Sequence, residues 1–226
     1  MGIQAFIKEV ELAANKLRER EGREVTLIFH DDADGICSGA AVKWALEDLG
    51  YDVELLPLER LLVDVIRKVH SAEGRIIVYA DMGSPHADLI SRLNGGRNFV
   101  LILDHHDPAK VEDPNLINLN PELYGMRGEE DASGSTVSYL FASRLNSRAK
   151  KLAYLALIGS CELPSGIKGL NRIVLQEAQA SGVIDKRMRI SGLGITVKKA
   201  FRSLQILGPV GYFEGGPLMG VKAVLG

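Results

Sequence analysis

Apolar residues follow two spacings along the first half of the chain, one typical of helices and one typical of buried strands. Four short aliphatic or β-branched runs are predicted strands: residues 25–29, 51–58, 75–80 and 99–103. Helical spacing or a helix start marks the segments between and before them: residues 3–21, 36–49, 60–71 and a helix opened by Ser84–Pro85. This alternation predicts an α/β fold, a mainly parallel sheet with helices on both faces.

The pattern changes after residue 106. Residues 107–133 are rich in Pro and Gly and are predicted to be mostly loop, with a short fifth strand at 116–119. Helical spacing returns at residues 133–145, 150–160, 168–181 and 194–206, and the tail 208–226 has no assignable pattern. We expect one domain over residues 1–185, followed by a short helical and basic extension, 186–226, too small for a full second domain.

Three of the predicted strands end in acids or histidines. The run 99–103 leads into Asp104–His105–His106, which holds two of the five histidines of the chain. The run 25–29 leads into the segment 30–35, His-Asp-Asp-Ala-Asp-Gly, and the run 75–80 leads into Asp81. A polar loop that happens to contain histidines is the simpler interpretation of each cluster alone. However, parallel strands place their carboxyl ends along one edge of a sheet, so we expect the clusters to converge.

The clustered residue types suit a divalent cation. His30, Asp32 and Asp34 alternate, and they share one side if the chain stays extended until Gly35 lets it turn into the next helix. Imidazole and carboxylate ligands favour Mn²⁺ or Mg²⁺. Asp81 could bridge two ions, and His105 and His106 add nitrogen ligands or phosphate contacts. Such a set matches the needs of two-metal phosphoester hydrolysis.

Composition limits the class of protein. The 226 residues are 46% hydrophobic and 25% charged, which is typical of a globular protein. The chain has no apolar run of membrane-spanning length and does not begin with a secretory signal, so we expect no membrane association. Cys37 and Cys161, the two cysteines, are too far apart in sequence for a metal knuckle, which fits a cytoplasmic protein.

Charge is distributed unevenly. Residues 1–143 contain 14 Lys and Arg against 25 Asp and Glu, whereas residues 144–226 contain 13 against 4. A cation-loaded centre beside a polyanion-binding flank would explain this asymmetry, and a helical surface that merely carries basic residues is the alternative. The candidates for nucleic-acid binding are Lys150, Lys151, Lys186, Arg187, Arg189, Lys198, Lys199 and Arg202.

These motifs resemble those of the DHH phosphoesterases. The segment 30–35, Asp81 and the Asp104–His105–His106 triplet resemble the first three signature motifs of that family. Residues 120–125, 133–135 and 170–175 resemble its archaeal RecJ-like branch, so the resemblance extends over about residues 25–185.

The resemblance implies a role for each matching residue. His30 and Asp32 would hold a first Mn²⁺ ion, Asp34 and His105 a second, and Asp81 would bridge them. His106 would face the phosphate, with Asp104 orienting the histidines as a catalytic partner. Other polar residues nearby receive structural roles: Asp31 and Asp107 as solvated loop acids, His70 and His86 as surface histidines, and Ser133–Ser135 as a helix cap.

The chain departs from the family pattern in two places. The family's fourth motif contributes an Asp to the second metal, but residues 157–163 contain only Glu162, which either replaces it or leaves the site one ligand short. We therefore expect the second ion to bind more weakly. The residues after position 185 are too few for the family's carboxyl-terminal substrate domain, so we expect the sequence to be either a natural short form or a fragment.

Three functions are consistent with the resemblance. The first is an Mn²⁺-dependent, or alternatively Mg²⁺-dependent, RecJ-like exonuclease that acts on single-stranded DNA or RNA in replication or repair. The second is a weakly active or inactive replication scaffold that binds the GINS complex, as relatives with this fold do. The third is a phosphatase of short nucleotides, because the missing domain is the one that usually grips a long strand.

Overall fold

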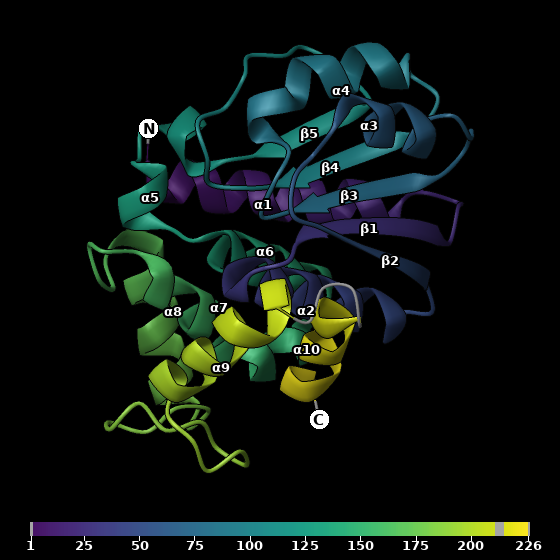
Figure 1. Cartoon of the computed structure of the whole chain (residues 1–226). Coiled ribbons are helices and arrows are strands. Elements are labelled where there is room, and N and C mark those ends of the chain that lie inside the picture. Colours follow the sequence, from purple (N-terminus) through teal and green to yellow (C-terminus); the bar gives the residue numbers. More distant parts are fainter. Residues whose placement is uncertain (1, 211–214, 226) are drawn as a thin grey trace.

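The computed structural model describes residues 2–210 and 215–225, and a parallel sheet organises them (Figure 1). Its strands are β1 (Glu24–His30), β2 (Asp52–Leu58), β3 (Ile76–Ala80), β4 (Phe99–Leu103) and β5 (Leu116–Leu119). They lie in the order β2-β1-β3-β4-β5, and every pairing is parallel. The predicted fold class is therefore confirmed.

Side chains on alternate strand positions enter two separate cores. Leu27, Val78 and Leu101 point into the larger core, whereas Ile28 and Ile77 point into the smaller one. Successive residues of a strand face opposite sides of the sheet, so a strand that is apolar at every position needs cover on both faces. This explains why β3 and β4, which are buried at every position, read as continuous apolar runs.

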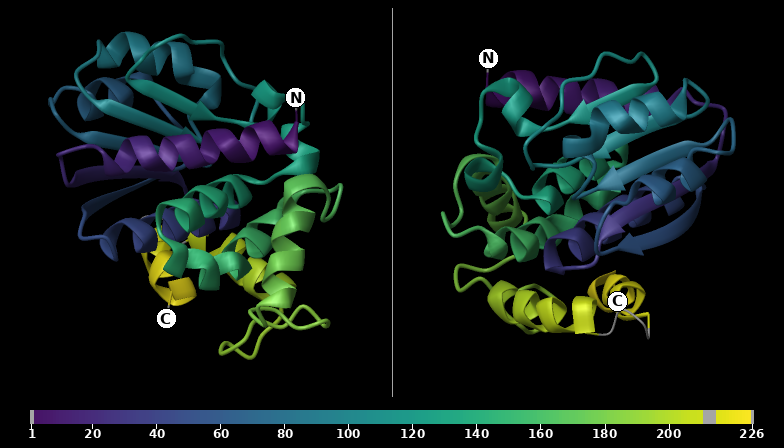
Figure 2. Two further views of the ribbon diagram at one scale, coloured as in Figure 1. Left: turned by 180° about the vertical axis from the view of Figure 1, so that it is seen from behind. Right: turned by 45° about the horizontal axis from the view of Figure 1, so that its top comes forward.

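Helices supply that cover on both faces (Figure 2). α3 (Val63–Val69) and α4 (Ala87–Asn94) lie over the smaller core, and α4 follows the short 3₁₀ turn η1 (Ser84–His86). On the larger core lie α1 (Ile3–Arg18), α2 (Ala33–Glu47) and α6 (Gly134–Leu145). α2 packs closely against α6, and both are buried along almost their whole length.

The second half of the chain is helical, with the elements η2 (Pro121–Tyr124), α5 (Gly128–Asp131), η3 (Ser147–Leu152), α7 (Ala153–Gly159), η4 (Ser160–Glu162), α8 (Gly169–Ala180), α9 (Val197–Val210) and α10 (Gly216–Leu225). The predicted helix 150–160 is thus partly 3₁₀, and the one predicted from residue 194 begins at Val197. α10 lies in the tail that has no assignable pattern, of which residues 211–214 and 226 are outside the described part.

α9 and α10 pack against α2 instead of extending away from the sheet domain. The backbone N–H of Ala33, at the start of α2, donates to the Gln205 side chain on α9 at 3.0 Å. The Tyr154 hydroxyl of α7 donates to the backbone carbonyl of Val224 in α10. In the described part of the chain, no helix is both long enough and apolar enough to cross a membrane.

His70 belongs to the interior and is not the surface histidine that the sequence predicts. Its side chain is fully buried, with Nδ1 3.0 Å from Asn94 Oδ1 and Nε2 2.9 Å from the Tyr79 hydroxyl. Burial lowers the pKa of His70, and the hydrogen bond to Asn94 only partly opposes this. The ring therefore serves as a neutral link between α3, α4 and β3.

Replacing His70 by Gln should lower the free energy of unfolding by about 1–3 kcal/mol at pH 7.5, because Tyr79 and Asn94 lose a buried partner. Below about pH 6.5 the unfolded chain binds a proton at His70 that the folded chain does not, so this residue's stabilisation is lost as pH falls. The difference in free energy of unfolding between the wild type and the variant, measured by urea unfolding, should thus be smaller at pH 5 than at pH 7.5. His86→Gln, at an exposed position, is the control; equal deficits at both pH values would contradict the account.

Candidate metal centre

The carboxyl ends of β1, β3 and β4 bring the predicted clusters to one edge of the sheet. The registers pair Phe29 with Ala80 and Ala80 with Leu103, so the next residues along these strands, His30, Asp81 and Asp104, follow at equivalent positions. The three motifs are therefore neighbours in space although more than twenty residues separate each from the next.

Asp81 lies at the centre of the cluster. Its Oδ2 is 3.9 Å from His30 Nδ1, and its Oδ1 is 3.4 Å from His105 Nε2. Asp32 Oδ2 approaches the same His30 nitrogen at 2.8 Å, and Asp34 Oδ2 lies 3.8 Å from His105 Nε2. Each oxygen of the Asp81 carboxylate thus faces a different histidine and a different second acid.

Two groups of potential ligand atoms share Asp81. One combines it with His30 and Asp32, and the other with His105 and His106; within each group, all atoms lie within 4.8 Å of one another. His105 and Asp34 are both buried, whereas His106 is partly exposed. The distances bring together all five of the residues predicted from the first three motifs to bind metal.

The turn after β1 differs from the expected extended segment. α2 begins at Ala33, three residues earlier than predicted, because the Asp32 side chain caps it by accepting from the Gly35 N–H at 2.9 Å. Asp34 therefore lies in the first turn of a helix and not on a strand. A Cβ on Gly35 would come within 2.2 Å of the His30 carbonyl oxygen, so glycine is required for this close turn.

The amino terminus of α6 holds Asp34. The N–H groups of Gly134 and Ser135 donate to its two carboxylate oxygens at 2.8 and 2.9 Å. Ser133 also caps α6 by accepting from the Thr136 N–H, as predicted. The sequence interpretation found the cap but missed the contact with Asp34, which joins residues one hundred positions apart.

Two further glycines permit this packing. A Cβ on Gly134 would lie 2.1 Å from Asp81 Oδ1, and one on Gly159 would lie 2.0 Å from Asp34 Oδ1. Both distances are far below van der Waals contact. α6 and α7 consequently approach the carboxylates more closely than any other residue type would allow.

Asp81 has a strained backbone conformation and a carboxylate that is destabilised by its surroundings. It has φ of 61°, in the left-handed region that is rare for residues other than glycine. Burial and repulsion from Asp34 and Asp32 raise its pKa well above the usual range. Asp81 Oδ1 and His105 Nδ1 are also buried without a hydrogen-bond partner. A cation bound here would relieve both the repulsion and the unsatisfied carboxylate.

The Asp104 side chain fixes the double-histidine turn. Its oxygens accept from the Ser84 N–H at 2.8 Å, from the backbone N–H groups of His105 and His106, and from His106 Nδ1 at 2.7 Å. Burial opposes ionisation, but these bonds and the nearby histidines lower the pKa of Asp104. The hydrogen bond to Asp104 in turn raises the pKa of His106. Asp104 thus fixes the orientation of the partly exposed His106 ring and favours its protonated form.

Asp32 acts on His30 in the same way on the other side of the cluster. Burial alone would lower the pKa of His30, but the Asp32 hydrogen bond and the surrounding carboxylates raise it to about 10. The pKa of Asp32 is lowered by the same contact, which outweighs its burial. His30 and Asp32 therefore form an imidazolium–carboxylate pair at this edge.

Glu162 lines the cavity that these residues form. The cavity has a volume of about 190 Å³ and is also lined by Asp32, Asp81, His105, His106 and Glu129. Removal from water in this crowded place, with repulsion from Asp32 and Asp34, raises the pKa of Glu162 to about 7. The position beside the cavity is compatible with the predicted ligand role, which stays a prediction.

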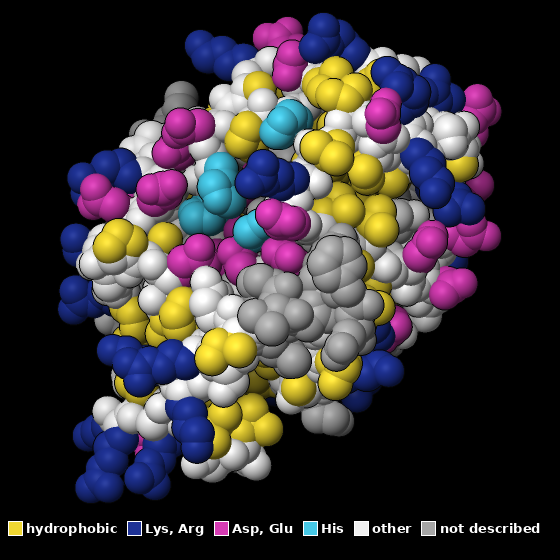
Figure 3. Space-filling view, viewed as in Figure 1, with side chains coloured by type: hydrophobic (Ala, Val, Ile, Leu, Met, Phe, Trp, Pro, Cys, Tyr) yellow, Lys and Arg dark blue, Asp and Glu magenta, His cyan; other side chains and the backbone are white. Residues whose placement is uncertain are grey.

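Two charged lining residues were not predicted from the sequence. Glu129 lines this cavity, and Arg60 lines a neighbouring one of about 180 Å³ beside His30 and His106. His86, which is exposed as predicted, also lines the second cavity. Arg60 follows β2, a strand without a ligand motif, so no local pattern pointed to it. Figure 3 shows the outcome on the surface, where histidine and acidic side chains gather next to basic ones.

Two predictions about nearby polar residues had different outcomes. Asp107 is exposed, as expected of a loop acid. Asp31, expected to be solvated too, is buried, and burial raises its pKa. The prediction for Asp31 was wrong because the chain turns into α2 directly after it and covers it.

The eight predicted nucleic-acid-binding residues are all exposed but lie on three separate elements. Lys150 and Lys151 are on η3, and Lys151 lies 4.2 Å above the Trp44 ring. Lys186, Arg187 and Arg189 are in the turns between α8 and α9, and Lys198, Lys199 and Arg202 are on α9. The geometry leaves their role a prediction.

Comparison with known proteins identifies the family of this fold. A family model described as the DHH family, N-terminal domain, matches residues 24–160. The chain is 28% identical over 183 residues to the uncharacterized protein MJ0831 of Methanocaldococcus jannaschii, covering 76% of this chain and 41% of the relative. It is 28% identical over 220 residues to the single-stranded-DNA-specific exonuclease RecJ of Thermus thermophilus, covering 87% and 32%. The chain thus spans less than half the length of either curated relative.

Solved structures share the fold. RecJ of Thermus thermophilus in complex with Mn²⁺ superposes with a TM-score of 0.70 at 22% identity, over 97% of this chain and 35% of that one, and RecJ has also been solved with Mg²⁺. CDC45 of Entamoeba histolytica superposes with a TM-score of 0.58 at 19% identity, over 82% and 41%. Because the family model spans more than half of the sequence and includes the three strand ends that carry His30, Asp81 and Asp104, the chain belongs to the DHH family.

Proposed function

We propose that the chain is a RecJ-like phosphodiesterase that cleaves single-stranded nucleic acid and depends on Mn²⁺, with Mg²⁺ as the alternative ion. The observation that carries the proposal is the shared position of Asp81 between two sets of ligand atoms. The RecJ relative is a single-stranded-DNA-specific exonuclease, and its structures contain Mn²⁺ or Mg²⁺. DNA replication or repair is the corresponding process.

The residues fit a pair of divalent ions. His30, Asp32 and Asp81 would hold the first, and Asp34, Asp81 and His105 the second, with Glu162 as a further oxygen ligand. Only nitrogen and carboxylate oxygen ligands are present in this set, which suits Mn²⁺ or Mg²⁺. Asp81 Oδ1 is buried without a hydrogen-bond partner, which supports this assignment. When bound, such ions activate water and neutralise charge on the phosphate.

Residues outside the ligand set would act on the substrate directly. His106 is held by Asp104, and this hydrogen bond raises its pKa. In its protonated form the ring can bind a phosphate oxygen or donate a proton to the leaving oxygen. Arg60 lines the adjacent cavity beside His30 and His106, where its guanidinium can bind a second phosphate. His106 and Arg60 would together hold two phosphates of the strand beside the acidic cluster.

The basic residues beyond position 143 would bind the rest of the strand. We propose that residues 186–226 form a short extension of a domain spanning 1–185 and that cations on both parts contact the phosphate backbone. All eight candidates are exposed, as a strand-binding role requires. Cleavage of short nucleotides by the same metal centre is a variant of this proposal.

A replication scaffold that binds GINS is the second candidate. The fold similarity to CDC45 and the absence of the fourth-motif Asp near position 162 favour it. This candidate predicts binding of a replication protein without cleavage. Digestion of labelled single strands at saturating Mn²⁺, run beside a pull-down from the source cell, separates the two.

Replacing Asp81 by Ala should reduce Mn²⁺-dependent cleavage of labelled single strands by more than about 100-fold, since both proposed ions lose a shared ligand. Bound Mn²⁺, measured by electron paramagnetic resonance, should fall in parallel. Asp107→Ala removes an exposed acid from the same loop region and should leave both readouts unchanged. Cleavage that survives in the Asp81 variant would rule out the bridging role.

Glu162→Gln tests whether this residue replaces the fourth-motif Asp. If it is a ligand, the Mn²⁺ concentration for half-maximal cleavage should rise by about tenfold, because the second site loses an anionic oxygen. Glu112→Gln, in the exposed loop before β5, provides the matched control. An unchanged Mn²⁺ dependence would show that Glu162 does not bind the ion.

Strand binding should weaken steeply with salt, because phosphate contacts release counterions. The measurement is fluorescence anisotropy of a labelled single strand in EDTA, which prevents cleavage. Changing Lys198, Lys199 and Arg202 to Ala should reduce the slope of log K against log salt by about two units. The same number of changes at Lys8, Lys16 and Arg92 keeps the net charge equal and should leave the slope intact. Binding that is indifferent to salt would argue for a protein partner.

A further inference from the structure

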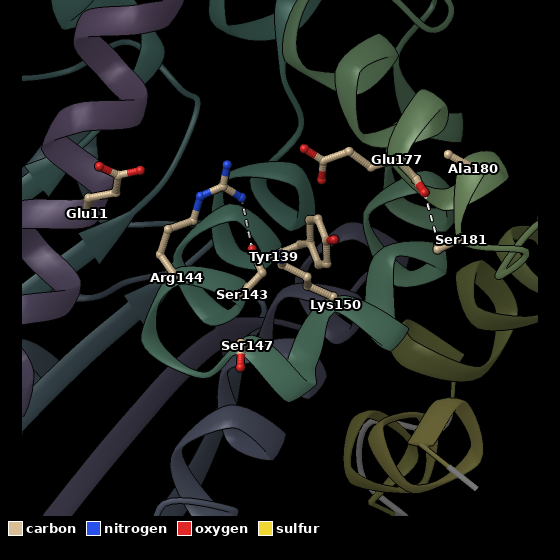
Figure 4. Close-up of a pocket in the computed structure, with 9 residues that line it drawn as sticks. All are labelled: Glu11, Tyr139, Ser143, Arg144, Ser147, Lys150, Glu177, Ala180 and Ser181. Carbon is tan, nitrogen blue, oxygen red and sulfur yellow. Dashed lines mark hydrogen bonds between the residues drawn. The ribbon is translucent and has the colours of Figure 1, made fainter.

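A second, more voluminous cavity lies away from the metal centre, between α1, α6, η3 and α8 (Figure 4). Its volume of about 720 Å³ is within the range of small-molecule sites. None of the residues predicted to bind metal lines it. It shares only Lys150 with the predicted strand-binding set.

Four charged side chains line this cleft: Glu11, Arg144, Lys150 and Glu177. Among the described residues, none of the four forms an ion pair with another side chain. Arg144 is half-buried and donates to Ser143 Oγ at 3.0 Å, which leaves most of its five donors free. In Figure 4 its guanidinium extends between the Glu11 and Glu177 carboxylates.

Hydroxyl groups form the floor and rim. Tyr139 and Ser143 are buried beneath the charged groups, at 1% and 4% exposure. Ser143 donates to the Leu140 carbonyl oxygen while it accepts from Arg144, so its orientation is fixed. Ser147 and Ser181 stand at the rim. Burial raises the pKa of Tyr139 to about 12, so the phenol stays a neutral donor.

We propose that this cleft binds a small sugar phosphate. Arg144 and Lys150 would pair with the phosphate, for which a guanidinium and an ammonium are the standard ligands. The Glu11 and Glu177 carboxylates would accept hydrogen bonds from sugar hydroxyls. A purely anionic ligand would be repelled by these two carboxylates, and a purely cationic ligand would be repelled by Arg144. The charge pattern therefore favours a molecule with a phosphate at one end and hydroxyls at the other.

The test is isothermal titration of the full chain with ribose 5-phosphate in EDTA, with inorganic phosphate and ribose titrated separately. Ribose 5-phosphate should bind more tightly than either of its parts. Arg144→Gln should weaken binding by about tenfold or more, since it removes a charge-assisted pair, and Glu177→Gln should weaken binding of ribose 5-phosphate but not of inorganic phosphate. Arg92→Gln, on the exposed face of α4, should have no effect.

Lys150→Gln provides a second variant at an exposed position, where the change should leave the fold intact. It should also weaken ribose 5-phosphate by several-fold. Absence of binding by the wild-type chain would overturn the proposal, as would equal affinity in the wild type and in both the Arg144 and Lys150 variants. Asp81→Ala leaves this cleft intact, so that variant should bind ribose 5-phosphate normally. Failure of the metal-centre proposal can therefore be distinguished from failure of the sugar-phosphate proposal.

Discussion

Repulsion among buried carboxylates is the constraint on which this structure depends. Asp34 and Asp81 are almost fully buried at one edge of the sheet, and Asp32 lies beside them. The fold offsets this repulsion with the helix terminus of α6 behind Asp34 and with His30 and His105 on either side of Asp81. Even so, Asp81 Oδ1 has no hydrogen-bond partner, and the backbone of this residue is strained. Backbone strain and electrostatic repulsion of this kind are typical of a functional site, and they point toward a bound cation.

Two glycines allow α6 and α7 to pack directly against the carboxylates at this edge of the sheet. α6 and α7 place Gly134 and Gly159 within about 2 Å, measured from a hypothetical Cβ, of the carboxylates. Any side chain there would push a helix away and remove the amides that hold Asp34. The helices that close the larger core are thus also the support of the acidic cluster. Stability of the core and geometry of the site cannot vary independently in this arrangement.

The sequence was sufficient for most of the sheet and for the residues that gather at its edge. Continuous apolar runs indicate strands that are buried on both faces of the sheet. Parallel strands place their carboxyl ends at one edge, so the residues that follow them are expected to lie together. It was not sufficient where position depends on contacts distant in sequence. The amide contact with Asp34, the burial of Asp31 and His70, and the cavity position of Arg60 arise from segments packed across the fold. The early start of α2 was missed because Asp32, interpreted only as a metal ligand, also caps the helix.

The central claim is that Asp81 bridges two divalent ions. The most direct measurement is an anomalous difference map at the manganese absorption edge from a crystal of the chain grown with Mn²⁺. The account predicts two peaks about 3.5–4 Å apart on either side of the Asp81 carboxylate, the stronger one next to His30 and Asp32 and the weaker one next to His105 and Asp34. A map without a peak in contact with Asp81, at saturating Mn²⁺, would contradict it.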